Sequence, residues 1–244
     1  AAAGHHPEAV GEGTIILPGR RAARGLTEAF LRQMDGRAML LPRILPVSAL
    51  DEAELGLSAD LGGTAGFDLP PAVAGMTRLA VLTRLVLQAE GAFGTRPTLD
   101  QAWPLAKALA ELMDEAEWAD VDLATRLPEA VQDSFAEHWQ VILKFLEIVT
   151  QAWPQWLASQ QVMNPVARQV TLLRAQARLW RDQAERGETT RIWAAGFTNI
   201  MPATADALRA VLACPGGRVI VPGLDLEMPE ETFGIYQTAT RRPG

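Results

Sequence analysis

The sequence has 244 residues, of which 48% are hydrophobic and 21% are charged, so its composition is that of a globular protein with a sizeable core. Its formal net charge of −7 argues against a protein that binds DNA through bulk positive charge, and no apolar run approaches the ~18 residues of a membrane span. The single cysteine, Cys214, excludes an internal disulfide framework and a four-cysteine metal or iron–sulfur site in this segment, and a reducing cytoplasm is the expected location.

Four short apolar runs bounded by turn residues predict β-strands. They are Thr14–Leu17, Ala38–Leu41 with a continuation to Leu45 left open, Arg191–Ala195 and Arg218–Val221. Apolar residues at helical spacing follow the first run, from Ala22 to Phe30, and recur over Thr204–Leu212. This alternation of strands and helices predicts an α/β fold with a mostly parallel sheet.

The stretch between the second and third predicted strands has a helical pattern. Three apolar stripes run through Leu79–Ala89, Leu105–Met113 and Glu129–Thr150, and a fourth consists of Val166, Val170, Leu173, Ala177 and Trp180. The fourth helix is expected to begin after Asn164, a good N-cap residue, with Pro165 in its first turn, and to end at Gly187. The sequence therefore predicts a large helical insertion in an α/β sheet.

Arginine dominates the basic residues, since only Lys107 and Lys144 among the 22 are lysines. The planar guanidinium suits phosphate binding, but a GC-rich genome gives the same bias without any function. The genomic explanation accounts better for the total number of arginines. It does not explain why they cluster at particular places in the chain.

One cluster follows the first predicted strand, where Pro18-Gly19-Arg20-Arg21 leads into a helix. A Walker-type phosphate loop needs a lysine and a hydroxyl residue, and this stretch has neither. A helix N-terminus carries about +0.5 charge, so each arginine there costs ~0.3–1 kcal/mol unless an anion offsets it. Two interpretations stay open: Arg20, Arg21 and Arg24 bind an anion such as a nucleic-acid backbone, or they form a solvated face or ion pairs to acids of this protein.

No catalytic or metal-binding motif stands out elsewhere. The third predicted strand ends in Ala194-Ala195-Gly196-Phe197, where a nucleotide hydrolase would carry acidic residues for Mg²⁺ and water. The acidic run from Glu111 to Asp122 is expected to be a solvated helix face, with a docking surface for a basic partner as the alternative. We expect no catalytic residue and no metal ligand in this segment.

Six segments stand out when they are taken in order. They are TIILPGRRAARGLTEAFLR, LLPRILPVSALDEAEL, DLPPAV, AEHWQVILKFLEIVTQAWPQWL, AAGFTNIMPATADAL and GRVIVPGLD, between Thr14 and Asp225. Together they resemble the N-terminal region of the AddB family in its alphaproteobacterial form. AddB is a subunit of the AddAB helicase–nuclease, which processes double-strand breaks for repair by homologous recombination.

The resemblance implies a RecA-like sheet, of the P-loop-NTPase type and related to UvrD and Rep, with an all-helical insertion. Residues 1–74 would form the first part of this helicase-like subdomain, residues 75–187 the insertion and residues 188–244 the remainder. The segment LPGRRAAR corresponds to the helicase motif that contacts single-stranded DNA, which gives Gly19, Arg20 and Arg21 as nucleic-acid-binding residues. Arg24 is added from the helical spacing. Because Ala195 holds no carboxylate where motor helicases carry an acidic pair, ATP hydrolysis is not expected of this subunit.

The resemblance also implies partners and cofactors. An AddA-type motor subunit would complete a heterodimer that acts on single-stranded and double-stranded DNA ends, and no membrane is involved. We expect the chain to be part of a longer protein, whose nuclease domain downstream of Gly244 would hold an iron–sulfur cluster and Mg²⁺. No cofactor is expected in this segment. Two other classes stay open: an α/β enzyme for a nucleotide or phosphorylated metabolite, with its phosphate loop upstream of residue 1, and a protein-docking module.

Overall fold

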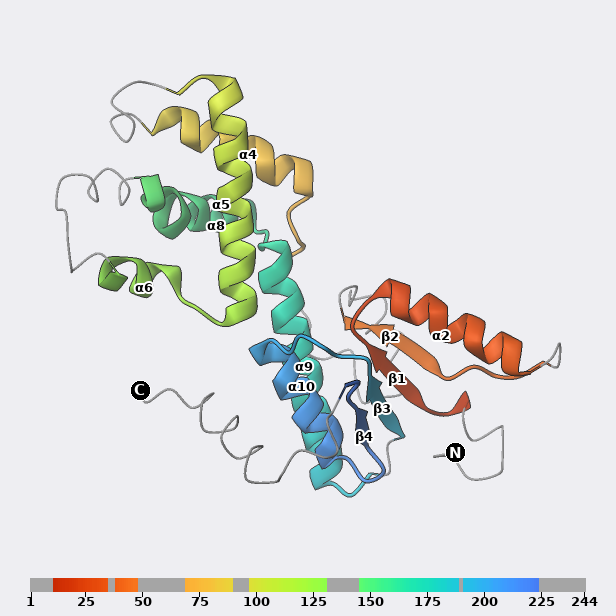
Figure 1. Ribbon diagram of the computed structural model, residues 1–244. Helices are drawn as coiled ribbons and strands as arrows, with labels where there is room; N and C mark the ends of the chain where they lie inside the picture. Colours follow the sequence, from red (N-terminus) through yellow and green to blue (C-terminus); the bar gives the residue numbers. More distant parts are fainter. Residues whose placement is uncertain are drawn as a thin grey trace.

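The computed structural model describes residues 11–34, 38–47, 69–89, 97–130, 145–188 and 191–223. The middle of the third predicted helical pattern, Glu129–Thr150, lies outside these ranges. Within them the chain forms a parallel β-sheet with helices on both faces and a separate group of helices beside it (Figure 1).

Four parallel strands in the order β2-β1-β3-β4 make up the sheet. They are β1 (Thr14–Leu17), β2 (Arg43–Pro46), β3 (Ile192–Ala195) and β4 (Arg218–Ile220). Ile16 of β1 lies in register between Leu45 and Ala194, and all three side chains are buried. The predicted α/β fold with a parallel sheet is therefore confirmed.

The second strand differs from its predicted start. The prediction began at Ala38, whereas β2 spans Arg43–Pro46 and Leu40 is 77% exposed. Pro42 explains the difference, because proline has no N–H to donate to a strand ladder. Pairing starts at the next residue, where the N–H of Arg43 donates to the carbonyl of Gly13 at 2.9 Å. The apolar residues before Pro42 precede the strand and do not form it.

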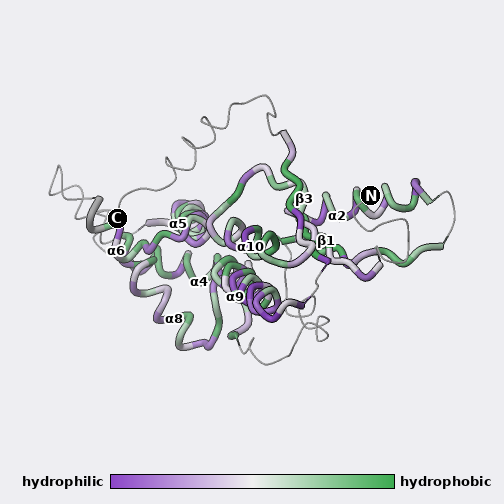
Figure 2. Tube along the Cα trace, turned by 90° about the horizontal axis from the view of Figure 1, so that it is seen from below, coloured by the Kyte–Doolittle hydropathy of each residue, from purple (hydrophilic) through white to green (hydrophobic). Residues whose placement is uncertain are grey.

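Helices cover the two faces of the sheet unequally. Helix α2 (Arg20–Gln33) packs against β1 and β2 on one face, and α9 (Pro165–Glu185) and α10 (Pro202–Ala213) cover the other (Figure 1). Hydrophilic and hydrophobic residues alternate along the turns of α9 (Figure 2), whose buried side packs against α10. The main core lies on the α9/α10 face, whereas α2 has no fully buried residue.

A second core holds together the helices between β2 and β3. These are α4 (Gly75–Gln88), α5 (Leu99–Ala119), α6 (Leu123–Ala130), the π-helical turn η3 (Ile148–Ala152) and α8 (Trp153–Gln160). Leu82, Val86 and Ala106 are fully enclosed in this core, beside Trp153. The helices predicted around the first two stripes and the fourth are confirmed. None of the helices in the described ranges is both long enough and apolar enough to span a membrane.

Helix α9 joins this second group to the sheet. Its Arg174 places Nη2 2.7 Å from Oδ1 of Asp120, at the end of α5, and Trp118 of α5 packs against the sheet core. Just before α9, the N–H of Met163 donates to the carbonyl of Pro71 at 2.9 Å. The helix therefore contributes to both parts of the molecule, and the predicted domain limits near residues 75 and 187 stay a prediction.

Candidate functional site

The carboxyl ends of β1 and β3 meet at the centre of the sheet. After β1 the chain passes through α2 to β2 on one side, whereas after β3 it passes through α10 to β4 on the other side. The strand order thus reverses between β1 and β3, and open α/β sheets bind ligands in the crevice outside such a point. The two loops approach each other there, since the Cβ position of Gly196 would lie 3.7 Å from Cδ of Pro18.

Helix α2 begins at this crevice without a cap. Its N-cap residue, Gly19, offers no side-chain hydrogen bond, and no acidic residue lies in the first turn. The N–H of Ala23 donates to the carbonyl of Gly19 at 3.1 Å, and the amides before it have no acceptor within the helix. Free amides and the positive end of the helix dipole together form a ready site for an anion.

The predicted residues Gly19, Arg20, Arg21 and Arg24 all come together at this end of α2, and the three arginines are exposed. With the residues that the structure describes, none of the three arginine side chains forms an ion pair or a hydrogen bond. Arg174, by contrast, binds an aspartate of another helix. Ion pairs are therefore not formed among these residues, and the three exposed guanidinium groups fit both a solvated face and an anion-binding surface.

Shallow hollows flank the arginines. One, of about 490 Å³, lies between α2 and β2 and is lined by Arg20, Arg24 and Ile44. Another, of about 580 Å³, follows the helix and adds Arg21 to its lining. Glu28 borders both hollows, so a carboxylate lies one helical turn beyond Arg24 and weakens the local positive potential.

The loop after β3 lies on the other side of the crevice. Gly196 has φ +78°, a left-handed conformation that glycine adopts without steric cost. Thr198 and Asn199 follow it and are exposed, and Pro202 opens α10. Sequence reasoning did not assign Thr198 and Asn199 to the site, although their position directly after a parallel strand could have suggested it. Ala195, at the end of β3, supplies no carboxylate to the crevice.

No group of three or more His, Cys, Asp or Glu side chains in the described ranges could hold a metal ion. Cys214 is buried, and its thiol donates to the carbonyls of Trp180 and Ala210 at 3.4 Å each. Burial raises the pKa of this thiol, so it behaves as a small apolar side chain and not as a nucleophile.

The acidic run Glu111–Asp122 is not a single solvated face. Asp114 binds the buried guanidinium of Arg78 at 2.9 Å, and Asp120 binds Arg174 at 2.7 Å. The sequence pattern could not show these pairs, because the arginines come from other helices. The expectation of a solvated helix face is therefore wrong for Asp114, whereas Asp120 is exposed as expected although it is ion-paired.

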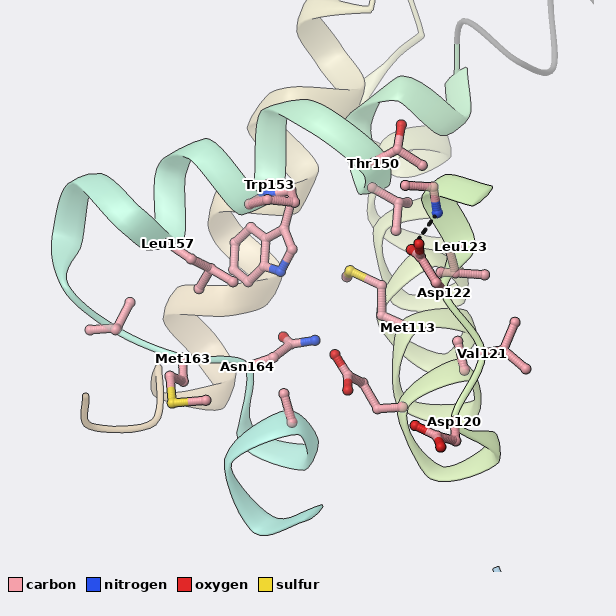
Figure 3. A pocket seen from close by; sticks show the side chains of 17 residues that line it. Met113, Asp120, Val121, Asp122, Leu123, Thr150, Trp153, Leu157, Met163 and Asn164 are labelled. Atoms are coloured by element: carbon pink, nitrogen blue, oxygen red, sulfur yellow. Dashed lines mark hydrogen bonds between the residues drawn. The ribbon is translucent and has the colours of Figure 1, made fainter. Parts of the chain in front are cut away.

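Sequence reasoning also missed a pocket of about 560 Å³ in the helical part, lined by α5, η3, α8 and the start of α9 (Figure 3). One signal for it was misinterpreted. Asn164 occupies the N-cap position of α9 as predicted, but its side chain forms no capping hydrogen bond. It points into the pocket instead (Figure 3).

The chain is an α/β protein with three exposed arginines at the start of the helix that follows the central strand β1 of a parallel sheet. No known family model matches the chain, and no curated protein sequence matches it significantly. The functional assignment therefore depends on the crevice and on the start of α2.

Proposed function

We propose that this chain is the helicase-like, ATPase-inactive region of an AddB-type subunit and that it binds single-stranded DNA during double-strand break repair. The observation that supports the proposal best is the start of α2. There Arg20, Arg21 and Arg24 are exposed and without partners among the described residues, beside uncapped amides.

The energetics of this turn favour a polyanionic ligand. Each cation near a helix N-terminus costs ~0.3–1 kcal/mol at low salt, and no acidic residue in the first turn offsets the cost. A DNA backbone removes the repulsion, accepts hydrogen bonds from the free amides and pairs with the guanidinium groups. Arg20 and Arg24 are about 6 Å apart along the helix axis, so neighbouring phosphates of one DNA strand can each contact one of the two side chains.

The RecA-like assignment is part of the proposal. The parallel sheet, the helix after β1 and the position of LPGRRAAR at the central crevice all support it. In this scheme β3 is the strand whose end would hold an acidic pair in a motor helicase. The subunit grips DNA and does not hydrolyse ATP, because Ala195 offers no carboxylate to Mg²⁺ there.

The AddB-type assignment also implies a partner subunit and two cofactors, all of which lie outside this segment. An AddA-type subunit supplies the motor and completes the heterodimer. The iron–sulfur cluster and the Mg²⁺ of the nuclease belong to a region downstream of Gly244. Within this segment the proposal assigns one task, which is to hold the DNA backbone at the start of α2.

The same crevice favours one competing function. A nucleotide or a phosphorylated metabolite also binds at a strand-order reversal, between the starts of two helices. That alternative requires a compact ligand and a phosphate loop upstream of residue 1, whereas the proposal requires an extended polyanion.

Binding of a fluorescently labelled oligo(dT) strand, measured by anisotropy at several salt concentrations, tests the proposal. The double variant Arg20→Ala/Arg21→Ala should bind more weakly. The slope of log K against log [salt] should fall by up to ~0.7 for each phosphate contact that is lost. Arg84→Ala/Arg178→Ala is the matched control, because both arginines are exposed and have no partner among the described residues.

An unchanged salt slope in the Arg20/Arg21 variant, or an equal loss in the control, would contradict the assignment. Tight binding and turnover of ATP with no affinity for oligo(dT) would favour the competing enzyme.

A further inference from the structure

The pocket in the helical part has the size and lining of a small-molecule site. Its volume is about 560 Å³, within the range of typical ligand pockets. Its walls come from the end of α5, the turn at 120–124, η3 and α8, and the segment that leads into α9. No residue of α2 or of the central crevice lines it, so it is separate from the DNA site proposed above.

Two deeply buried polar atoms in this pocket have no partner among the described residues. They are Oδ1 of Asn164 and Nε1 of Trp153, in residues that are 6% and 1% exposed. Both side chains point into the pocket, where Met113 faces them from α5 (Figure 3). A buried polar atom without a hydrogen bond costs about 1–3 kcal/mol, so a ligand that supplies the missing partners is favoured.

The pocket is also acidic. Glu117, Asp120 and Asp122 line it, and Arg174 forms an ion pair with Asp120. Asp122 accepts a hydrogen bond from the N–H of Ala124 at 3.0 Å (Figure 3). It accepts another from the hydroxyl of Thr125 at 2.6 Å.

Glu117 alone among the three forms no hydrogen bond or ion pair with a described residue. Burial raises the pKa of its carboxyl group, against the opposing effect of Arg174. A partly buried carboxylate of this kind favours a cation and disfavours phosphates and other anions.

The remaining lining is apolar. Val149, Leu157 and Val162 contribute aliphatic surface, and the indole of Trp153 stacks on that of Trp156 with ring centroids 5.1 Å apart. An aromatic or aliphatic body fits against these side chains, whereas a fully hydrated ion does not.

We propose that this pocket binds a small organic cation, with its charged nitrogen between Glu117 and Asn164 and its apolar body against Trp153 and Leu157. A cationic N–H group donates to the carboxylate of Glu117 and to Oδ1 of Asn164. In members of the class that also carry a hydroxyl group, its oxygen accepts from Nε1 of Trp153. The class is that of arylalkylamines and related protonated amines.

Titration of the ¹⁵N-labelled chain with 2-phenylethylammonium tests the proposal by NMR. The indole N–H signal of Trp153, assigned by its loss in Trp153→Phe, should shift and saturate. The neutral isostere 2-phenylethanol and the anion 3-phenylpropionate should bind at least about tenfold more weakly, the loss expected for one charge-assisted hydrogen bond.

Three variants locate the ligand. Glu117→Gln keeps the shape of the side chain and should weaken binding of 2-phenylethylammonium about tenfold or more. Asn164→Ala should weaken it severalfold. Glu115→Gln, on the same helix but outside the pocket, should leave it unchanged. The thermal midpoint of each variant shows that it is folded.

The proposal is overturned if none of the three probes shifts the Trp153 signal. Equal affinity for the amine and the alcohol would overturn it as well, and so would a Glu117→Gln variant that binds the amine as tightly as the original chain. Because the readout is local to Trp153, these outcomes are independent of oligo(dT) binding at α2.

Discussion

Arg78 and Arg21 carry the same guanidinium group in opposite surroundings. Arg78 is buried, donates to Oδ2 of Asp114 at 2.9 Å and to the carbonyl of Ala110 at 2.8 Å, and links α4 to α5. Arg21 is exposed at the start of α2 and binds no described residue. The first arginine is therefore part of the framework, and the second is available to a ligand.

Glu28 should limit DNA binding at α2. Its carboxylate borders the same hollows as Arg20 and Arg24, so it repels a phosphate held there. Glu28→Gln should increase the affinity for oligo(dT) severalfold at low salt and less at high salt, because salt screens the repulsion. Fluorescence anisotropy measures the change, and Glu185→Gln, an exposed acid on α9, is the control. A weaker or unchanged affinity would argue against phosphates at this position.

Glu117 should make stability depend on pH. Burial raises the pKa of its carboxyl group in the folded chain, although Arg174 opposes the effect. The unfolded chain therefore loses this proton at a lower pH than the folded chain does. The free energy of unfolding should fall as the pH rises from the ordinary glutamate pKa through the raised value.

Urea denaturation of the original chain and of Glu117→Gln at several pH values measures this contribution. The variant should be the more stable of the two above the raised pKa, and the difference should disappear in acid. A difference that grows as the pH falls would contradict the assignment.

At the scale of elements, the boundaries of α9 could be predicted because local chemistry sets them. Proline fits the first turn of a helix and glycine fits the left-handed residue after its end, and Pro165 and Gly187 occupy those places. Asn164 shows the limit of prediction from local sequence chemistry. Sequence chemistry gives its position at the N-cap, but the direction of its side chain depends on a pocket formed by other helices.

The sheet and the start of α2 also show which features the sequence predicts and which depend on tertiary packing. Short apolar runs bounded by turn residues located β1, β3 and β4 to within a residue. Strand β2 begins only after Pro42, because proline lacks the N–H that a strand ladder needs. The cluster of α2 arginines is visible in the sequence after the first predicted strand, and its role in DNA binding stays a prediction. Their lack of partners among the described residues depends on tertiary packing, which the sequence does not show.

Helix α9 should tolerate substitution on one side only. Leu173 is fully buried in the sheet core, so Leu173→Ala should lower the free energy of unfolding by about 2–5 kcal/mol. Arg178 is exposed on the same helix, and Arg178→Ala should change the free energy of unfolding by less than about 0.5 kcal/mol. Urea denaturation compares the two variants. Similar effects would mean that α9 does not pack as described.

At the scale of the whole molecule, the chain has two hydrophobic cores. One lies between the sheet and α9/α10, and the other lies among α4, α5, η3 and α8. They meet through the end of α5 and through α9, where the Arg174–Asp120 pair is partly exposed. Such a contact couples two units less tightly than a continuous core does.

Leu82→Ala should therefore destabilise one core and spare the other. Leu82 is completely buried in the helical core, so the amides of α4 and α5 should lose about 2–5 kcal/mol of protection. The amides of β1 and β3 should keep their protection against hydrogen exchange. Native-state hydrogen exchange measures both sets in one experiment. Equal losses in the two sets would show that the molecule opens as a single unit.

The π-helical turn η3 holds an extra residue directly before Trp153. A π-helical turn has one more residue than the α-helical turn it replaces, and Ile148–Ala152 lies directly before Trp153. The wider turn absorbs this residue, so deletion of Gln151 would restore regular α-helix and leave the residues after it facing nearly the same way relative to Phe145. The same deletion inside α8 would instead rotate the residues after it by about 100°. A codon lost in η3 would therefore spare the side of α8 that lines the pocket.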